Sequence, residues 1–279
     1  MCTRPCDEKP RTGLLTLALA VALGLVFISA PARASDSFST DWTRSAKSQA
    51  RLIAAGAGLA GFEIALSPDA ITYWRDPGDA GLPPTLDFSA SENVASVEPL
   101  FPAPKRITEA DGGQAFGYDG GVIFPLRVTA RDPAKPVTLK LNADFAVCEK
   151  VCLPAKAQLS LTLPAAADSP YASAIEVALA AVPRAVAPKD FGLIEAAGAD
   201  SWRLCAPHAA GPARDLFVEP PEGWWLKVAP APGAASGRDC FELTVGDKPK
   251  DAALPVALRL TLTGGAGAVE TKIETPKMN

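Results

Sequence analysis

The sequence of 279 residues contains a single histidine, His208, and only two methionines. A Ser–His–Asp or Cys–His hydrolase would need that one side chain at its centre. Because His208 follows Pro207, we interpret it as a surface loop residue. Structural zinc sites favour repeated C-x₂-C pairs with further histidines, and the sequence offers neither. No metal ion and no cofactor are therefore expected, although a reduced cysteine pair can bind Cu(I).

The sequence also lacks an excess of basic residues, with 27 Lys and Arg against 31 Asp and Glu. The formal net charge is −4, and no basic cluster stands out. Residues 1–34 hold four basic and two acidic side chains, so the charge of the remainder is −4 − 2 = −6. A mildly acidic chain of this kind gives no electrostatic basis for binding nucleic acid or anionic lipid.

The only long apolar run covers residues 14–30 and follows a basic start. The small residues Ala32 and Ala34 stand two apart just before Ser35, as a signal peptidase requires. A membrane anchor is the alternative, but the run is at the short end of what spans a bilayer. We predict a cleavable signal peptide at residues 1–34, export to the periplasm and a soluble mature chain of 279 − 34 = 245 residues.

Alternation of apolar and polar residues with period two dominates the rest of the chain. The clearest case is residues 137–145, where odd positions are apolar and even positions are polar. Such a pattern is typical of a strand with one buried face. Further strands are predicted at residues 62–66, 122–128, 159–163, 202–204, 216–218, 241–245, 256–262 and 269–273. Groups of Pro, Gly and Asp between them indicate turns, so the prediction is an all-β protein built from β-sandwiches.

One segment has helical spacing instead. Ser169 is a good N-cap and Pro170 suits the first helical position, and apolar residues then recur with helical period up to Pro183. We place the domain boundary in this segment. The predicted organisation is a first domain at residues 35–165, a helix and linker at 166–190, and a second, smaller sandwich-like domain at 191–279.

Four cysteines remain after the predicted cleavage, which removes Cys2 and Cys6: Cys148, Cys152, Cys205 and Cys240. Cys148 and Cys152 lie between the two best predicted strands, and a sharp turn could bring their Cα atoms within disulfide range. A small ring removes little chain entropy, and strained or exposed disulfides are the more easily reduced ones. The spacing alone leaves two interpretations open, a redox pair and an inert turn staple.

Cys205 and Cys240 each border a predicted strand of the second domain. A bridge between them would close a long loop and stabilise the fold more than a short ring does. We predict a structural disulfide here, with a second redox pair as the alternative.

Three segments of the first domain resemble a known family. They are Val147-Cys148-Glu149-Lys150-Val151-Cys152-Leu153-Pro154, the block at residues 73–84 with Ser91-Glu92-Asn93-Val94 after it, and Phe116-Gly117-Tyr118 leading into residues 122–128. Together they resemble the N-terminal periplasmic domain of the transmembrane disulfide reductase family DsbD. They are most similar to its ScsB branch, which is associated with suppression of copper sensitivity.

The resemblance implies an immunoglobulin-like β-sandwich with the cysteines on an inserted hairpin, and a thiol:disulfide oxidoreductase of the protein-disulfide reductase type. Cys152 would form the mixed disulfides and Cys148 would resolve them. The electron donor would be a membrane-embedded DsbD/CcdA-like protein. The acceptors would be oxidised envelope proteins of thioredoxin-like or disulfide-isomerase-like type, and cytochrome c biogenesis is a process associated with the family.

Two departures from the family pattern accompany the resemblance. The cysteine spacing is narrower than in better-known members, and the stretch Asp111-Gly112-Gly113 lacks the aromatic residues of their cap loop. Phe116 or Tyr118 is predicted to shield the pair instead. Two other functions stay open: a non-catalytic binding module that presents the Tyr73-Trp74 and Trp224-Trp225 loops, and a copper-tolerance protein that uses its thiolates.

Overall fold

The structure is a computed structural model that describes residues 37–79, 81–109, 112–165, 168–231 and 237–277. The predicted signal peptide, with Cys2 and Cys6, lies outside the described residues. The described residues belong to one compact unit. Within the described residues, no helix is long and apolar enough to cross a membrane.

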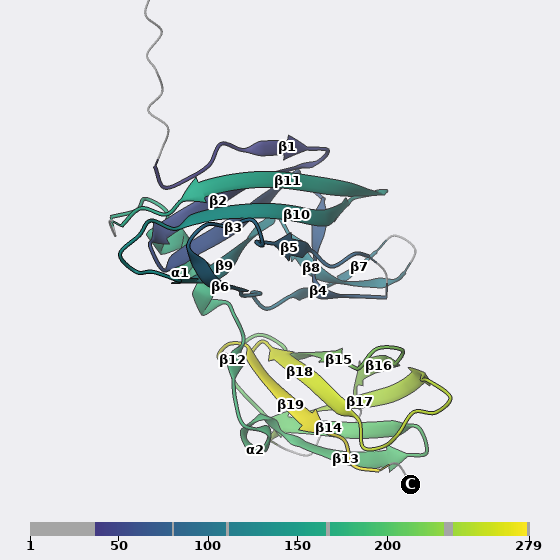
Figure 1. Cartoon of the computed structure of the whole chain (residues 1–279). Helices are drawn as coiled ribbons and strands as arrows, with labels where there is room; N and C mark the ends of the chain where they lie inside the picture. The colour runs from purple at the N-terminus through teal and green to yellow at the C-terminus, as the bar shows by residue number, and fades with distance from the viewer. Residues whose placement is uncertain (1–36, 80, 110–111, 166–167, 232–236, 278–279) are drawn as a thin grey trace, which may run out of the picture. The chain divides into compact units, whose positions relative to one another are not determined.

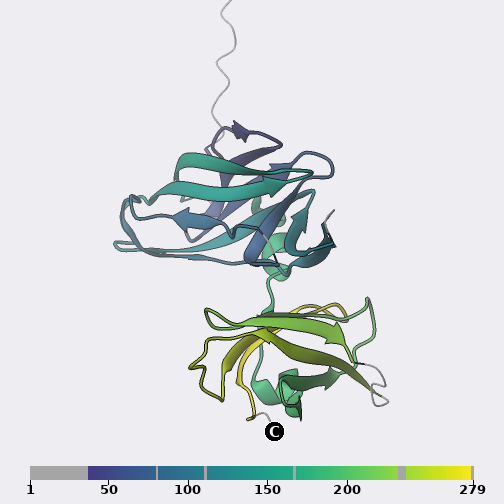
Figure 2. The same ribbon diagram turned by 90° about the vertical axis from the view of Figure 1, so that its right-hand side faces the viewer.

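The first half of the chain forms two antiparallel sheets (Figures 1 and 2). The first sheet has the order β1 (Thr43–Ser45), β2 (Ser48–Gly56), β3 (Leu59–Leu66), β9 (Gly121–Ala130) and β6 (Val94–Pro99). The second has the order β11 (Cys152–Thr162), β10 (Thr138–Cys148), β4 (Ile71–Gly78), β8 (Gln114–Asp119) and β7 (Lys105–Thr108), with β5 (Thr85–Asp87) paired to β10. We refer to this pair of sheets as the first sandwich.

The alternation predicted at residues 137–145 explains how the second sheet is oriented. The odd-numbered side chains of β10, from Leu139 to Val147, are buried in the main core. That core also contains Phe62 and Phe124, whose rings stack 6.2 Å apart. The even-numbered residues of β10 therefore point to the opposite face of the sheet, because successive side chains of a strand alternate.

Helix α1 (Ala172–Ala180) begins later and ends earlier than the spacing predicts. The N-cap residue is Tyr171 and not Ser169. The Ser169 hydroxyl instead accepts a hydrogen bond from the backbone N–H of Tyr171. Ile175 is the buried residue of the helix. The helix packs mainly against strands β9 and β2. The helix thus covers part of the first sheet.

The second half forms two further sheets, which we call the second sandwich. One has the order β12 (Arg184–Ala185), β19 (Val269–Glu274), β18 (Ala257–Thr263) and β15 (Asp215–Glu219). The other has the order β13 (Leu193–Gly198), β14 (Ser201–Pro207), β17 (Arg238–Asp247) and β16 (Trp225–Pro230). Trp202 and Phe241 lie in the core of the second sandwich, which is separate from that of the first.

The segment predicted as a linker carries structure of its own. Strand β12 pairs in parallel with β19, and α2 (Pro188–Phe191) buries Phe191 in the core of the second sandwich. Pro188 stands at the start of this short helix, where its missing N–H costs no hydrogen bond. The five strands predicted in the second half correspond to β14, β15, β17, β18 and β19.

Candidate active site

Cys148 and Cys152 form a disulfide at the end of the hairpin of β10 and β11. The two residues are directly opposite each other in the strand register, and their Cα atoms are 4.1 Å apart. The three residues between them make the turn that connects the strands. The sharp turn that a four-residue separation demands is therefore supplied by a β-hairpin.

The alternation of side chains along β10 determines on which face of the sheet the disulfide lies. Cys148 is an even-numbered residue of β10, so its side chain lies on the face away from the main core. There it belongs to a small separate cluster with Tyr73, Ala115 and Ala146. Cys148 is only 3% exposed, whereas Cys152 is an exposed residue. The two residues of the bond thus differ in burial: Cys148 is covered and Cys152 is exposed.

The side chain that covers the disulfide is Tyr73 of β4. Its hydroxyl oxygen lies 2.8 Å from Sγ of Cys148 and 3.4 Å from Sγ of Cys152, and the residue is fully buried. The hydroxyl hydrogen is donated to Oε1 of Glu109 over 3.2 Å. A phenol carries a single hydrogen, so it is given either to this carboxylate or to a sulfur. A disulfide sulfur carries no hydrogen, so the phenol is the donor in any hydrogen bond to the oxidised pair.

Gly81 allows the backbone to approach the Tyr73 ring closely. Gly81 has φ +114°, in the left-handed region that favours glycine. A Cβ atom at Gly81 would lie 2.3 Å from Cε1 of Tyr73, so only a residue without a side chain fits there. The close approach fixes the ring over the cysteines from the outer side.

Glu109 follows strand β7 at the start of the turn that leads into β8. Its backbone N–H donates to the carbonyl of Gly113, and its own carbonyl accepts from Gly112. A carboxylate oxygen of Glu109 and the sulfurs of Cys148 and Cys152 all lie within 4.8 Å of one another. After reduction, the two thiolates would make this donor set suitable for a soft cation such as Cu(I).

An ion pair flanks the hairpin turn on its exposed side. Nζ of Lys47 lies 2.8 Å from Oε2 of Glu149, the residue that follows Cys148. The hydrogen bond from Lys47, together with its charge, lowers the pKa of Glu149, and the same contact raises the pKa of Lys47. Both side chains are solvent-exposed, so the pair adds little to stability.

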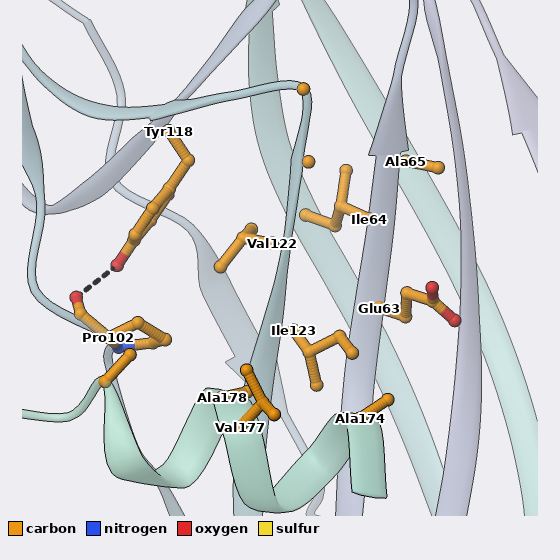
Figure 3. Close-up of a pocket in the computed structure, with 13 residues that line it drawn as sticks. Glu63, Ile64, Ala65, Pro102, Tyr118, Val122, Ile123, Ala174, Val177 and Ala178 are labelled. Atoms are coloured by element: carbon orange, nitrogen blue, oxygen red, sulfur yellow. Dashed lines mark hydrogen bonds between the residues drawn. The ribbon is translucent and has the colours of Figure 1, made fainter. Parts of the chain in front are cut away.

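The structure does not bring Phe116 or Tyr118 to the sulfurs, although the sequence predicts one of them as a shield. Tyr118 is opposite Thr72 in the register and lies in the main core, while Tyr73 and Cys148 lie on the other face of the sheet. The Tyr118 hydroxyl donates to the carbonyl of Pro102 (Figure 3). Burial raises the pKa of Tyr118 well above its ordinary value. The observed cover is Tyr73, and shielding by Phe116 or Tyr118 stays a prediction.

Figure 3 also shows the pocket beside Tyr118, which lies between α1 and strands β3 and β9. Its volume is about 400 Å³, and its lining includes Ile123, Val177 and Ala178. Neither Cys148 nor Cys152 lines it. This pocket is therefore separate from the candidate active site.

Sequence reasoning missed the roles of Tyr73 and Glu109. Tyr73 stands in one of the family segments, and Glu109 precedes the turn residues Asp111-Gly112-Gly113. Both are at odd positions that share a face of the sheet with Cys148. This parity could have identified them, but only after the pairing of β10 with β4 and of β4 with β8 was known.

Cys205 and Cys240 also form a disulfide, as predicted from their places in the sequence. They are directly opposite each other on β14 and β17, with Cα atoms 4.1 Å apart. His208 is exposed nearby, with Nδ1 3.1 Å from Oδ1 of Asp239, in agreement with a surface residue. The structural role of this disulfide stays a prediction.

The geometry therefore defines a class: an all-β domain with a disulfide at the end of a hairpin, in which one cysteine is buried and the other is exposed. Residues 43–164 match the family model described as the N-terminal part of the thiol:disulfide interchange protein DsbD. The resemblance inferred from the sequence is thus confirmed over this stretch.

A comparison with solved structures gives the same fold. The N-terminal periplasmic domain of ScsB from Proteus mirabilis matches with a TM-score of 0.66 and 23% identity, over 86% of this chain and 99% of that one. At this identity the match shows the fold, which confirms the predicted immunoglobulin-like, all-β architecture with a cysteine hairpin. No curated protein sequence matches the chain.

Proposed function

We propose that the protein is a periplasmic thiol–disulfide interchange module that relays reducing equivalents through Cys148 and Cys152. The observation that carries this proposal is the asymmetry of the disulfide. Cys152 is exposed, while Cys148 is buried under a hydroxyl group that can donate a hydrogen bond to its sulfur. Exchange requires one sulfur open to attack and a second that leaves as a thiolate.

The reducing step starts with a thiolate of the electron donor, which attacks Sγ of Cys152. The Cys148–Cys152 bond breaks, a mixed disulfide forms on Cys152, and Cys148 leaves as a thiolate. The O–H of Tyr73 lies within hydrogen-bonding distance of that sulfur, and hydrogen bonds to charged acceptors are the stronger ones. The donor's second thiol then releases Cys152, so two electrons and two protons have moved from a dithiol to this pair.

The oxidising step reverses the roles. The thiolate of Cys152 attacks the disulfide of an acceptor protein and forms a mixed disulfide, and the acceptor's other sulfur leaves as a thiolate. Cys148 then attacks Cys152, restores the internal disulfide and releases the reduced acceptor. The 4.1 Å separation of the Cα atoms keeps the resolving sulfur within bonding reach throughout.

The cycle requires a dithiol donor and a disulfide acceptor, and the family resemblance implies what kinds of protein these are. A membrane-embedded protein of DsbD/CcdA-like type would supply the electrons, and a periplasmic thioredoxin-like or disulfide-isomerase-like protein would receive them. Export by the predicted signal peptide would place the module in the compartment where disulfides persist and need reduction.

A trapping experiment tests the proposal. The Cys148→Ser variant keeps the attacking thiol and lacks the resolving one, so it should hold mixed disulfides with donor and acceptor in the native cell envelope. The Cys240→Ser variant is the matched control, and it should trap nothing through Cys152. A redox titration adds a second criterion: a Cys148–Cys152 potential below about −300 mV, as in ordinary structural disulfides, would refute the proposal.

A further inference from the structure

Strand β15 of the second sandwich is buried on both of its faces. Leu216 and Val218 point into the core of the second sandwich. Phe217 lies between them in the sequence, is 1% exposed and belongs to the core of the first sandwich. Because side chains alternate along a strand, Phe217 lies on the face opposite to that of Leu216 and Val218. Asp215 and Glu219 lie on the same face as Phe217.

The first group of contacts joins β15 to β4, the strand that carries Tyr73. The ring of Phe217 packs edge-on against Trp74, with centroids 6.0 Å apart. The guanidinium of Arg75 donates to both carboxylate oxygens of Glu219, at distances of 2.8 to 3.2 Å. Trp74 and Arg75 are the two residues that follow Tyr73 directly.

The second group joins β15 to the hairpin of β7 and β8, which leads to Glu109. Arg106 of β7 donates to the two carboxylate oxygens of Asp215 at 2.9 and 3.0 Å, and to the carbonyl of Leu216 at 2.9 Å. Phe116, which faces Arg106 across the hairpin, packs edge-on against Phe217 at 5.0 Å. Strand β7 has four residues, lies at the edge of its sheet and pairs only with β8.

Strand β15 thus contacts both elements that bring other groups to the sulfurs: β4, which carries Tyr73, and the β7–β8 hairpin, which carries Glu109. We propose that Asp215 is a positioning residue for the redox site: through Arg106 it fixes the β7–β8 hairpin, and so it holds the Glu109 carboxylate beside the cysteines. The second sandwich would then set the reactivity of the pair through the β7–β8 hairpin. This inference rests on the proposed interchange function.

The expected effect follows from charge. After reduction, the carboxylate of Glu109 stands close to both sulfurs and disfavours the thiolate form of Cys152, because like charges repel. The Asp215→Asn variant weakens the two-pronged bond to Arg106 and releases the hairpin, so Glu109 moves away from the sulfurs. The Cys152 thiol should therefore become more reactive.

The test is a double-mutant cycle with Glu109→Ala, carried out on the reduced full-length mature protein. The rate of iodoacetamide alkylation of Cys152 at pH 7 is measured by mass spectrometry. Asp215→Asn should raise the rate about threefold in the wild-type background and leave it unchanged within error in the Glu109→Ala background, since coupled residues are not additive. The matched control is Asp200→Asn, which removes an exposed ion pair with Lys248 elsewhere in the second sandwich and should have no effect.

The outcomes separate this inference from the proposed function. Equal effects of Asp215→Asn in the two backgrounds, or none in either, would overturn the positioning role. Far-ultraviolet circular dichroism and the melting temperature show whether the variant is folded. If Asp215→Asn does not fold, Arg106→Lys replaces it in the same cycle. This substitution keeps the positive charge and removes the bidentate hydrogen bonding to Asp215. A wild-type protein that fails to exchange disulfides with a dithiol would refute the proposed function itself.

Discussion

The two disulfides of this protein share one local geometry and differ in everything around it. Each joins residues directly opposite each other on antiparallel strands, with Cα atoms 4.1 Å apart. Cys148–Cys152 closes the end of a hairpin whose outer strand, β11, is an edge strand. Cys205–Cys240 joins β14 and β17, which are the two inner strands of a four-stranded sheet.

The surroundings decide what each bond can do. The hairpin pair has one exposed cysteine, a phenol hydroxyl within hydrogen-bonding distance and a carboxylate nearby. The second pair is flanked on both sides by paired strands, since Leu193 is opposite Cys205 and the carbonyl of Cys240 accepts from Ala231. Cys240 is 8% exposed. The covalent geometry alone therefore does not distinguish a redox disulfide from a structural one.

The largest contrast is expected when each pair is broken by one substitution. Cys152→Ser should abolish the transfer of electrons from a dithiol to a protein disulfide, because the attacking sulfur is gone. Cys240→Ser should keep that turnover. An insulin-reduction assay with a supplied dithiol donor measures both, and a Cys152→Ser protein that retains full turnover would contradict the assignment. A pure binding module would keep its partner after Cys152→Ser.

The next contrast concerns stability. Replacing both Cys205 and Cys240 with serine should lower the free energy of unfolding by about 4 kcal/mol, because the bond closes a loop with a sequence separation of 35. The same change at Cys148 and Cys152, with a separation of 4, should cost about 2 kcal/mol or less. Urea unfolding of the two double variants gives the difference. The reverse order would mean that loop length does not govern these two bonds.

A smaller effect is expected from the group that covers the redox pair. Tyr73→Phe keeps the ring under Gly81 and removes the hydroxyl, so the Cys148 thiolate loses a donor whose hydrogen is directed to Glu109 in the oxidised protein. Reduction by a dithiol should slow about tenfold, since a hydrogen bond to a charged group contributes about 1.5 kcal/mol or more. Tyr171→Phe is the control, because its hydroxyl bonds to Ser39 and Arg51. Equal rates for Tyr73→Phe and wild type would remove Tyr73 from the mechanism.

The smallest effect is expected at the hairpin turn. The pKa of Glu149 is lowered by Lys47, so its ion pair contributes stability above the ordinary glutamate pKa of about 4.3 and loses it as the pH falls through the lowered value. Glu149→Gln should remove this acid-side dependence without changing turnover at pH 7. Melting curves between pH 3 and about pH 7 measure it, and a marked loss of activity at neutral pH would show that the pair positions the cysteines.

Much of the architecture is present in local patterns. The alternation at residues 137–145 predicts both the strand and its buried face, and every strand predicted in the second half corresponds to an observed one. The helix starts later than Ser169 and Pro170 indicate, because Ser169 uses its hydroxyl in a turn with Tyr171 and not as the N-cap. Strand β16 was not predicted, since Trp225 was assigned to a loop.

The site was only half predictable. The cysteines and their pairing follow from spacing and resemblance. Tyr73 on β4 and Glu109 just after β7 are 75 and 39 positions away from Cys148 in the sequence. Long-range strand pairing determines such contacts, and no local pattern encodes which strands will pair. Phe116 and Tyr118 were chosen for their aromatic rings, and the register directs those rings into the core.

The parity of β10 also has a consequence for how this activity could be lost. Because side chains alternate, a slip of the strand by one residue would carry Cys148 into the apolar interior and expose Leu139 and Leu141 to water. The leucines that build the core therefore also keep the sulfur on the outside. A substitution far from the cysteines that weakens this register could silence the module while leaving both thiols chemically intact.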